Sequence, residues 1–327
     1  MIEIDEYNPS TMQLAKPIYD SHKRILLAAG RSIHPEYLKR IKKLNVRYLF
    51  IEDAESAGIT LDEMLDMPTW MDTIDITQEV FNEAGKIKNI TQPTLRKVQK
   101  TIDRLVTEVQ KRPLLVLIPS TSIAEELKPF AHGVNVALLS LQIGRKMGYN
   151  MLQLKTLATG ALLHDIGKAI NKDVEKHPVH GFELLRNVSE LSILAAHVAF
   201  QHHESLNGTG FPRSIEGKQF HEMAQICGVA NLYENSISKD MLSPHEAMEL
   251  IMTKSDNTYS HPVIQAFYNG VPTYPPGTKV VLNTGSEGIV YKIDKNLHRP
   301  TVRVFPTHEE IALAEKPTII IEKIASS

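Results

Sequence analysis

The sequence predicts a mainly α-helical protein with a small α+β unit at its N-terminus and a small β unit at its C-terminus. Three observations predict this class. Short apolar runs flank one helical segment before residue 62, and helical apolar spacing dominates from about residue 63 to 268. Short β-like runs separated by turns follow Phe267. A chain of 327 residues is long enough for two or three domains.

The composition limits the classes of function. Apolar residues make up 42% of the chain, and the net charge of -2 gives no support for a nucleic-acid polymer or a membrane surface as a partner. The single cysteine, Cys227, excludes an internal disulfide and suits a reducing compartment. The N-terminus lacks the pattern of a signal peptide, and no apolar run approaches the roughly 18 to 20 residues of a membrane helix. We therefore expect a cytoplasmic protein.

Residues 1–62 are predicted to form the small α+β domain. The apolar runs at 25–27 and 48–51 have the length of short strands, and a helical pattern occupies 35–43 between them. Gly30 is expected in the connecting turn.

Residues 63–119 are predicted to form a helical linker. Leu95, Val98, Ile102 and Leu105 recur at three- and four-residue steps, which places them on one helical face. Such a face packs on its own domain or pairs with a second chain, and a homodimer is one consequence that we consider. Pro113 and Pro119 interrupt the chain before the next domain.

Residues 120–270 are predicted to form a helical domain that contains the functional site. His132 shares a helical face with Val136, Leu139 and Ile143, so its imidazole should point into the core.

The C-terminal residues, 271–327, are predicted to form a small β-barrel or β-sandwich. Turn-forming residues separate four β-like runs. These runs lie at 280–282, 289–293, 302–304 and 318–321.

The sequence His164-Asp165-Ile166-Gly167-Lys168 carries the strongest functional signal. It follows an apolar helical run at 157–163 and places an imidazole beside a carboxylate. A hydrolytic metal site needs several imidazoles and carboxylates in one pocket. The helical region supplies six candidate ligands: His132, His164, Asp165, His177, His202 and His203.

These ligands suit two divalent cations. The two oxygens of Asp165 can bridge two metals, which would lower the pKa of a shared water and clamp the oxygens of a phosphate ester. Lys168 would neutralise charge that builds up on the phosphate. Many imidazoles among the ligands favour iron or manganese, with zinc as an alternative, over magnesium or calcium. We therefore predict Asp165 and Lys168 as catalytic residues.

A shaped loop follows the histidine pair. Glu204 precedes the run Asn207-Gly208-Thr209-Gly210-Phe211-Pro212, which contains two glycines and a proline around an aromatic ring. Gly210, Phe211 and Pro212, together with Lys168, are the predicted substrate-binding residues, because an aromatic ring beside the pocket can stack on a nucleobase.

Together, the strings HDIGK, HPVHG at 177–181, HHE at 202–204 and NGTGFP resemble the motifs of the HD-GYP family, a branch of the HD phosphohydrolases that cleaves the bacterial messenger cyclic di-GMP. The resemblance covers about residues 120–268 and implies an HD-type helical bundle. It also implies one metal at His132, His164 and Asp165, and a second at Asp165, His177, His202 and His203.

Three positions depart from that family. Its last metal ligand is an aspartate, and Asn231 stands there, so only a neutral carbonyl oxygen is offered to the first metal. The segment 234–244 contains none of the arginines with which the family grips phosphates. Phe211 replaces the tyrosine that gives the family its name.

Three hypotheses follow. The first is a metal-dependent phosphodiesterase that hydrolyses cyclic di-GMP to the linear dinucleotide pGpG or to GMP in bacterial signalling, with activity reduced by Asn231. The second is a catalytically impaired domain of this type that acts as a nucleotide receptor or protein-interaction module. The third is a related HD hydrolase for another nucleotide or phosphate ester.

Overall fold

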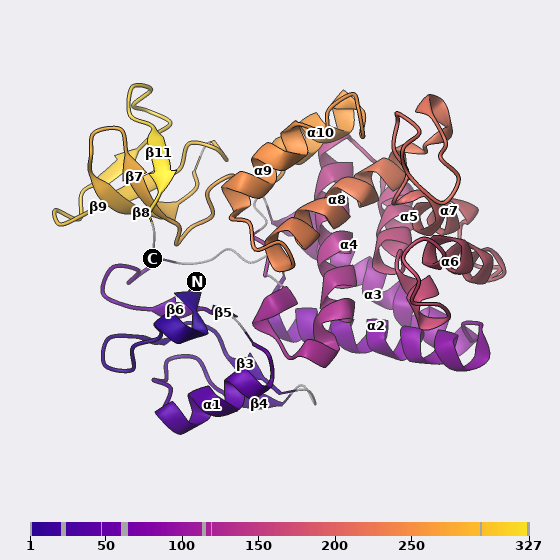
Figure 1. Cartoon of the computed structure of the whole chain (residues 1–327), viewed down its shortest axis with the longest axis horizontal. Helices are drawn as coiled ribbons and strands as arrows, with labels where there is room; N and C mark the ends of the chain where they lie inside the picture. The colour runs from indigo at the N-terminus through magenta and orange to yellow at the C-terminus, as the bar shows by residue number, and fades with distance from the viewer. Residues whose placement is uncertain are drawn as a thin grey trace. The chain divides into compact units, whose positions relative to one another are not determined.

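A computed structural model of the chain describes residues 2–20, 24–46, 48–59, 65–112, 116–118, 120–294 and 296–325. These residues fall into two compact units (Figure 1). The helical unit comprises Glu63–Pro119 and Pro129–Val271. The other unit comprises Met1–Asp62, Ser120–Lys128 and Pro272–Ser327. The expected chain break at Pro113 and Pro119 lies outside the described residues.

The helical unit is an all-α bundle, as the apolar spacing predicts, and its buried positions are mostly leucine, isoleucine, valine and alanine. Its helices are α2 (Met67–Ile87), α3 (Gln92–Lys111), α4 (Lys128–Lys146), α5 (Met151–Leu162), α6 (His177–Arg186), α7 (Ile193–Gln201), α8 (Glu222–Ser238), α9 (Pro244–Met252) and α10 (His261–Tyr268).

The helices α2 and α3 belong to this bundle. Trp70 of α2 is 1% exposed and donates a hydrogen bond from its indole Nε1 to Asn135 Oδ1 on α4, over 3.1 Å. The apolar face of α3, including Ile102 and Leu105, is buried, and α3 packs against α5. The segment expected as a linker therefore contributes to the core of the helical unit.

Polar caps set the beginnings of several helices. Asn150 begins α5 with a capping box that includes Gln153, and Ser243 does the same for α9 with Glu246. The hydroxyl of Ser192 accepts a hydrogen bond from a main-chain amide at the start of α7. These local signals determine where the helices begin and therefore where the intervening loops can lie.

The N-terminal residues form the expected small α+β arrangement around a buried apolar cluster that includes Ile33, Ile41 and Leu49. Gly30 adopts a φ of +72° in a turn, a conformation that favours glycine. The strands pair as three antiparallel two-stranded sheets, β1–β5, β2–β6 and β3–β4. The elements are β1 (Ile2–Glu3), β2 (Gln13–Leu14), β3 (Ile18–Tyr19), β4 (Ile25–Leu27), α1 (Pro35–Lys43), β5 (Tyr48–Leu49) and β6 (Ile51–Glu52).

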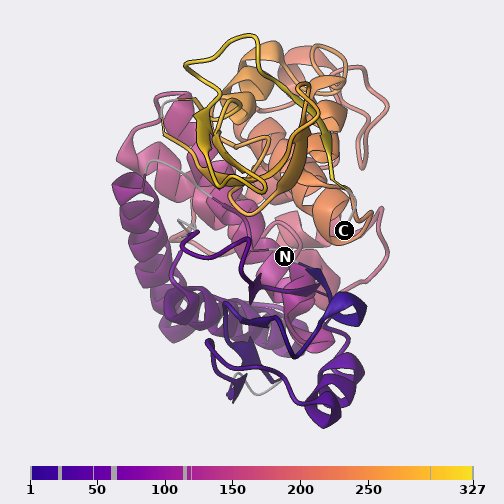
Figure 2. The ribbon, with the colours of Figure 1, turned by 90° about the vertical axis from the view of Figure 1, so that its left-hand side faces the viewer.

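The C-terminal residues form one five-stranded antiparallel sheet in the order β10-β9-β8-β7-β11, whose strands curve around a small apolar core (Figure 2). A sandwich is therefore wrong, because all five strands belong to one sheet. The last strand begins at Ile321, not at Thr318. Strand β10 was not predicted, because its sequence Glu310-Ile311-Ala312 contains only one β-branched residue and no aromatic residue. The strands are β7 (Lys279–Leu282), β8 (Glu287–Lys292), β9 (Thr301–Val304), β10 (Glu310–Ala312) and β11 (Ile321–Ile324).

The fold class is thus confirmed: a helical bundle accompanied by small β-containing parts at both ends of the chain. Within the described residues, no helix combines the length and the apolar character that crossing a bilayer requires.

Leu105→Ala should destabilise the helical unit by about 2–5 kcal/mol, because it removes a fully buried side chain from the core. Lys100 lies on the same helix and is exposed, so Lys100→Ala is the matched control. Its free energy of unfolding should stay within about 0.5 kcal/mol of that of the wild type. Urea unfolding followed by the fluorescence of Trp70, the only tryptophan, measures both changes. Equal stability of the two variants would mean that α3 is not part of the core.

Candidate metal centre

The predicted ligands lie at or near helix ends that meet in one place. His132 lies in the second turn of α4, and His177 is the first residue of α6. The remaining ligands directly follow helices: His164 and Asp165 come between α5 and the short 3₁₀ helix η4 (Ile166–Ala169), and His202 and His203 come after α7. A helix end leaves the backbone free to turn, so adjacent residues such as His202 and His203 can both face the same pocket.

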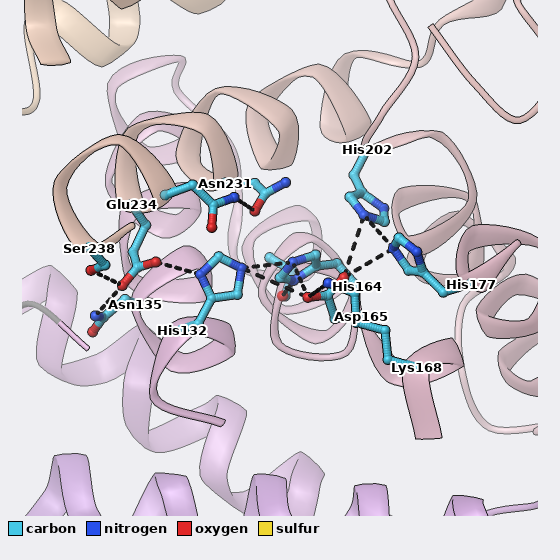
Figure 3. Close-up of polar contacts among 12 residues, drawn as sticks. His132, Asn135, His164, Asp165, Lys168, His177, His202, Asn231, Glu234 and Ser238 are labelled. Atoms are coloured by element: carbon cyan, nitrogen blue, oxygen red, sulfur yellow. Dashed lines mark hydrogen bonds and ion pairs between the residues drawn. The ribbon is translucent and has the colours of Figure 1, made fainter. Parts of the chain in front are cut away.

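The carboxylate of Asp165 lies at the middle of this cluster, and each oxygen faces a different set of imidazoles (Figure 3). Its Oδ2 is 3.5 Å from Nε2 of His164 and 3.9 Å from Nε2 of His132. Its Oδ1 is 3.1 Å from Nε2 of His177 and 3.8 Å from Nε2 of His202. This is the arrangement that a bridging carboxylate between two cations requires.

Main-chain hydrogen bonds orient two of the imidazoles. Nδ1 of His164 donates to the carbonyl of Ala161 and Nδ1 of His202 donates to the carbonyl of Ala199, each over 2.8 Å. Because these nitrogens carry the protons, each Nε2 directs a lone pair into the pocket. Two Nε2 atoms face each other at 3.3 Å in each half of the site, in the pairs His132–His164 and His177–His202.

Burial keeps the imidazoles of His164, His202 and His203 neutral. It lowers the pKa of His164 to about 4, although the carboxylate of Asp165 opposes the shift. Burial and the adjacent imidazoles lower the pKa of His203 to about 3 and hold that of His202 well below its ordinary value. Burial opposes the ionisation of Asp165, but the imidazoles and the Lys168 ammonium outweigh it and hold the carboxyl pKa well below its usual range. Neutral imidazoles beside a carboxylate are the form in which these groups bind cations.

Two overlapping groups of side chains can each hold a cation. In each group, one ligand atom from every residue lies within 4.8 Å of the others. The first group is His132, His164 and Asp165; the second is Asp165, His177, His202 and His203. A donor set of imidazoles and one shared carboxylate fits divalent cations.

Lys168 also reaches this centre. Its ammonium lies 2.6 Å from Oδ2 of Asp165, and its side chain is 37% exposed. The lysine therefore contacts the carboxylate of Asp165 and is partly exposed to solvent.

Gly167 explains how His177 comes so close to Asp165. A Cβ at position 167 would lie 1.9 Å from the carbonyl oxygen of His177 and 2.6 Å from the amide nitrogen of Gly181. Only a glycine allows η4 and α6 to approach this closely. The glycine of the HDIGK string thus contributes to the geometry of the site.

The loop that follows the histidine pair is closed on itself by Glu204. This buried carboxylate accepts hydrogen bonds from the amides of Arg213 and Ile215, over 2.8 and 3.2 Å. A Cβ at Gly210 would lie 2.4 Å from the Cα of Glu204, so this glycine packs on the loop backbone. The ring of Phe211 stacks on His203, with 4.5 Å between centroids and 19° between planes. One face of the Phe211 ring is therefore covered by the imidazole of His203.

Helix α8 contributes two residues beside His132. Asn231 is buried, and its Oδ1 accepts a hydrogen bond from Asn235 Nδ2 over 2.8 Å. One helical turn later, Glu234 contacts Nδ1 of His132 (Figure 3). The sequence motifs did not identify Glu234, although its position three residues after Asn231 places both on the same face of a helix.

The model of the HD domain family matches residues 130–238, which contain all of the predicted ligands. Residues 130–238 are therefore similar to HD domains. The solved structure of Bd1817, an HDG"Y"P protein from Bdellovibrio bacteriovorus, is 20% identical, covers 82% of this chain and 94% of its own, and superposes with a TM-score of 0.51. This likeness shows a shared fold.

Curated relatives of the HD domain region are named cyclic di-GMP phosphodiesterases. The Pseudomonas aeruginosa protein PA4108 is 27% identical over 227 residues, which cover 62% of this chain and 54% of that protein. PdeB of Borreliella burgdorferi is 26% identical over 186 residues, 50% of this chain and 48% of that protein. The Thermotoga maritima protein is 27% identical over 193 residues, which cover 52% of this chain and 52% of that protein. The chain spans about half the length of these relatives. The resemblance to HD-GYP proteins is confirmed by these matches.

Gly167→Ala should separate η4 from α6, destabilise the helical unit by about 3 kcal/mol and weaken manganese(II) binding at least about 10-fold. Gly181→Ala is the matched control at the same contact, because its Cβ would have no neighbour closer than 3.4 Å. The control should change stability by less than about 1 kcal/mol. Urea unfolding and calorimetric metal titration of both variants measure these effects, and wild-type metal binding in Gly167→Ala would contradict the assigned role.

Proposed function

We propose that this protein is a metal-dependent phosphodiesterase that hydrolyses cyclic di-GMP to pGpG or GMP. The observation that carries the proposal is the buried carboxylate of Asp165, which presents one oxygen to each of two groups of imidazoles. The named activities of the curated relatives support the choice of substrate class.

In this proposal, His132, His164 and Asp165 hold one divalent cation, and Asp165, His177, His202 and His203 hold the second. Iron or manganese is the preferred metal, with zinc as an alternative, because imidazoles dominate the ligand set. Bound cations supply the means to activate water near neutral pH and to neutralise a phosphate ester. Asn231 can offer its carbonyl oxygen to the first cation, because the hydrogen bond from Asn235 uses one of the two lone pairs of that oxygen.

The protein's own side chains bind and orient the substrate. Lys168 is held at the carboxylate of Asp165 and is partly exposed, so its ammonium can pair with a phosphate oxygen. The ring of Phe211, held on one face by His203, offers its other face to a guanine base. Gly210 and Pro212 shape the loop backbone that positions this ring.

Asp165→Ala should abolish the bridge between the two groups. We expect the metal content to fall from about two per chain to below one, and turnover of cyclic di-GMP to fall by about 1,000-fold, equivalent to ~4 kcal/mol of transition-state stabilisation. Elemental analysis and turnover after anaerobic addition of iron(II) or manganese(II) measure both. The exposed Asp240→Ala is the control for the loss of a carboxylate. Unchanged metal content and hydrolysis in Asp165→Ala would overturn the proposal.

A second candidate function is a nucleotide receptor with an impaired active site, which the neutral Asn231 and the absence of arginine from 234–244 favour. Asn231→Asp decides between the two. An added carboxylate should tighten the binding of the first cation by about 10- to 100-fold, because ligand charge strongly affects cation affinity. A wild-type protein that binds cyclic di-GMP without turnover, together with a large gain of hydrolysis in Asn231→Asp, would establish the receptor. High wild-type turnover that this substitution leaves unchanged would exclude it.

A further inference from the structure

Glu234 is a buried carboxylate on α8, one helical turn after Asn231. Its exposed fraction is 0%. A carboxylate buried in this way is costly unless it is hydrogen-bonded. The hydroxyl of Ser238 donates to its Oε1 over 2.8 Å, and Nδ2 of Asn135 donates to the same oxygen over 3.3 Å. These two donors leave Oε2 directed toward α4.

Oε2 of Glu234 lies 2.5 Å from Nδ1 of His132. Since a carboxylate only accepts hydrogen bonds, Nδ1 carries the proton and donates it to Glu234. The other ring nitrogen, Nε2, faces His164 and Asp165, at 3.3 Å and 3.9 Å, and it presents a lone pair there whenever the ring carries a single proton (Figure 3). The imidazole of His132 thus links the buried carboxylate of Glu234 to the first cation group.

This link distinguishes His132 from the imidazoles beside it. The Nδ1 atoms of His164 and His202 donate to main-chain carbonyls, which carry no charge. Asn231 is also neutral. The first group consequently has one carboxylate in direct contact, Asp165, which it shares with the second group. Glu234 contacts the first group through Nδ1 of His132, and this contact is not shared with the second group.

We propose that Glu234 is a positioning residue that supplies, through the imidazole of His132, the negative charge that Asn231 does not supply directly to the first cation. The proposal rests on the proposed function in that both require cations at Asp165. A carboxylate behind a ligating histidine fixes the tautomer and makes the imidazole more basic, and loss of such a partner typically costs 10- to 100-fold in metal affinity.

Glu234→Gln removes the charge and preserves the size of the side chain. The test is calorimetric titration of manganese(II) into the full chain after removal of bound metal. We expect one of two binding events to weaken by about 10- to 100-fold and the other to change by less than about 3-fold. Glu249→Gln is the matched control, because Glu249 also pairs with an imidazole, His245, over 3.6 Å but is 71% exposed. It should leave both binding events unchanged.

The substitution Asn231→Asp provides a second, independent test of the proposal. An aspartate at 231 would bring a negative charge to the first cation directly, so Glu234→Gln should weaken binding less in that background than in the wild type. A double-mutant cycle of the two substitutions measures this coupling. Strict additivity of the two effects would overturn compensation by Glu234.

The melting temperature of the metal-free protein separates positioning from a merely structural role. We expect Glu234→Gln to leave this temperature near that of the wild type and to reduce the stabilisation that manganese(II) produces. Wild-type metal affinity in Glu234→Gln, with or without a lower melting temperature, would overturn the proposal. Turnover of cyclic di-GMP is measured on the same samples: a wild type that binds two cations without turnover would overturn the proposed function and leave the test of Glu234 intact.

Discussion

The organisation of the helical unit depends on one constraint, the burial of an ionised carboxylate among imidazoles. Asp165 is 7% exposed, and burial alone would favour its neutral form. Four Nε2 atoms within 4 Å and the ammonium of Lys168 reverse that preference. A buried carboxylate with this many partners is costly to build for packing alone, which is why the cluster indicates a cation site.

The bundle satisfies this constraint by bringing helix ends together. His164 and Asp165 follow α5, His177 begins α6, and His202 follows α7. Residues at helix ends can turn their side chains toward a common point, while the helices behind them pack an apolar core. The close approach of η4 and α6 at Gly167 then brings the imidazole of His177 to within 3.1 Å of the carboxylate. The packing of the helices therefore also determines where the candidate ligands lie.

Polar residues behind the ligands complete the site. Glu204 closes the loop that holds Phe211 against His203, and Glu234 contacts Nδ1 of His132. Both carboxylates are buried and fully engaged in hydrogen bonds, so each fixes the orientation of a ring that faces the pocket. Asn231 itself accepts a hydrogen bond from Asn235 on the same helix.

The sequence by itself determined the helical class and the six candidate ligands, because periodicity and motif spacing can be read directly from the order of residues in the chain. The position of β10 and the single five-stranded sheet escaped prediction, since β10 has little β-forming sequence and strand pairing joins residues that are distant in the chain. Only the tertiary structure decided that Glu234 meets His132, 102 residues earlier, and which oxygen of Asp165 faces which imidazole. Such pairings depend on how helices pack, and packing is set by the shape of the whole core, which no local pattern encodes.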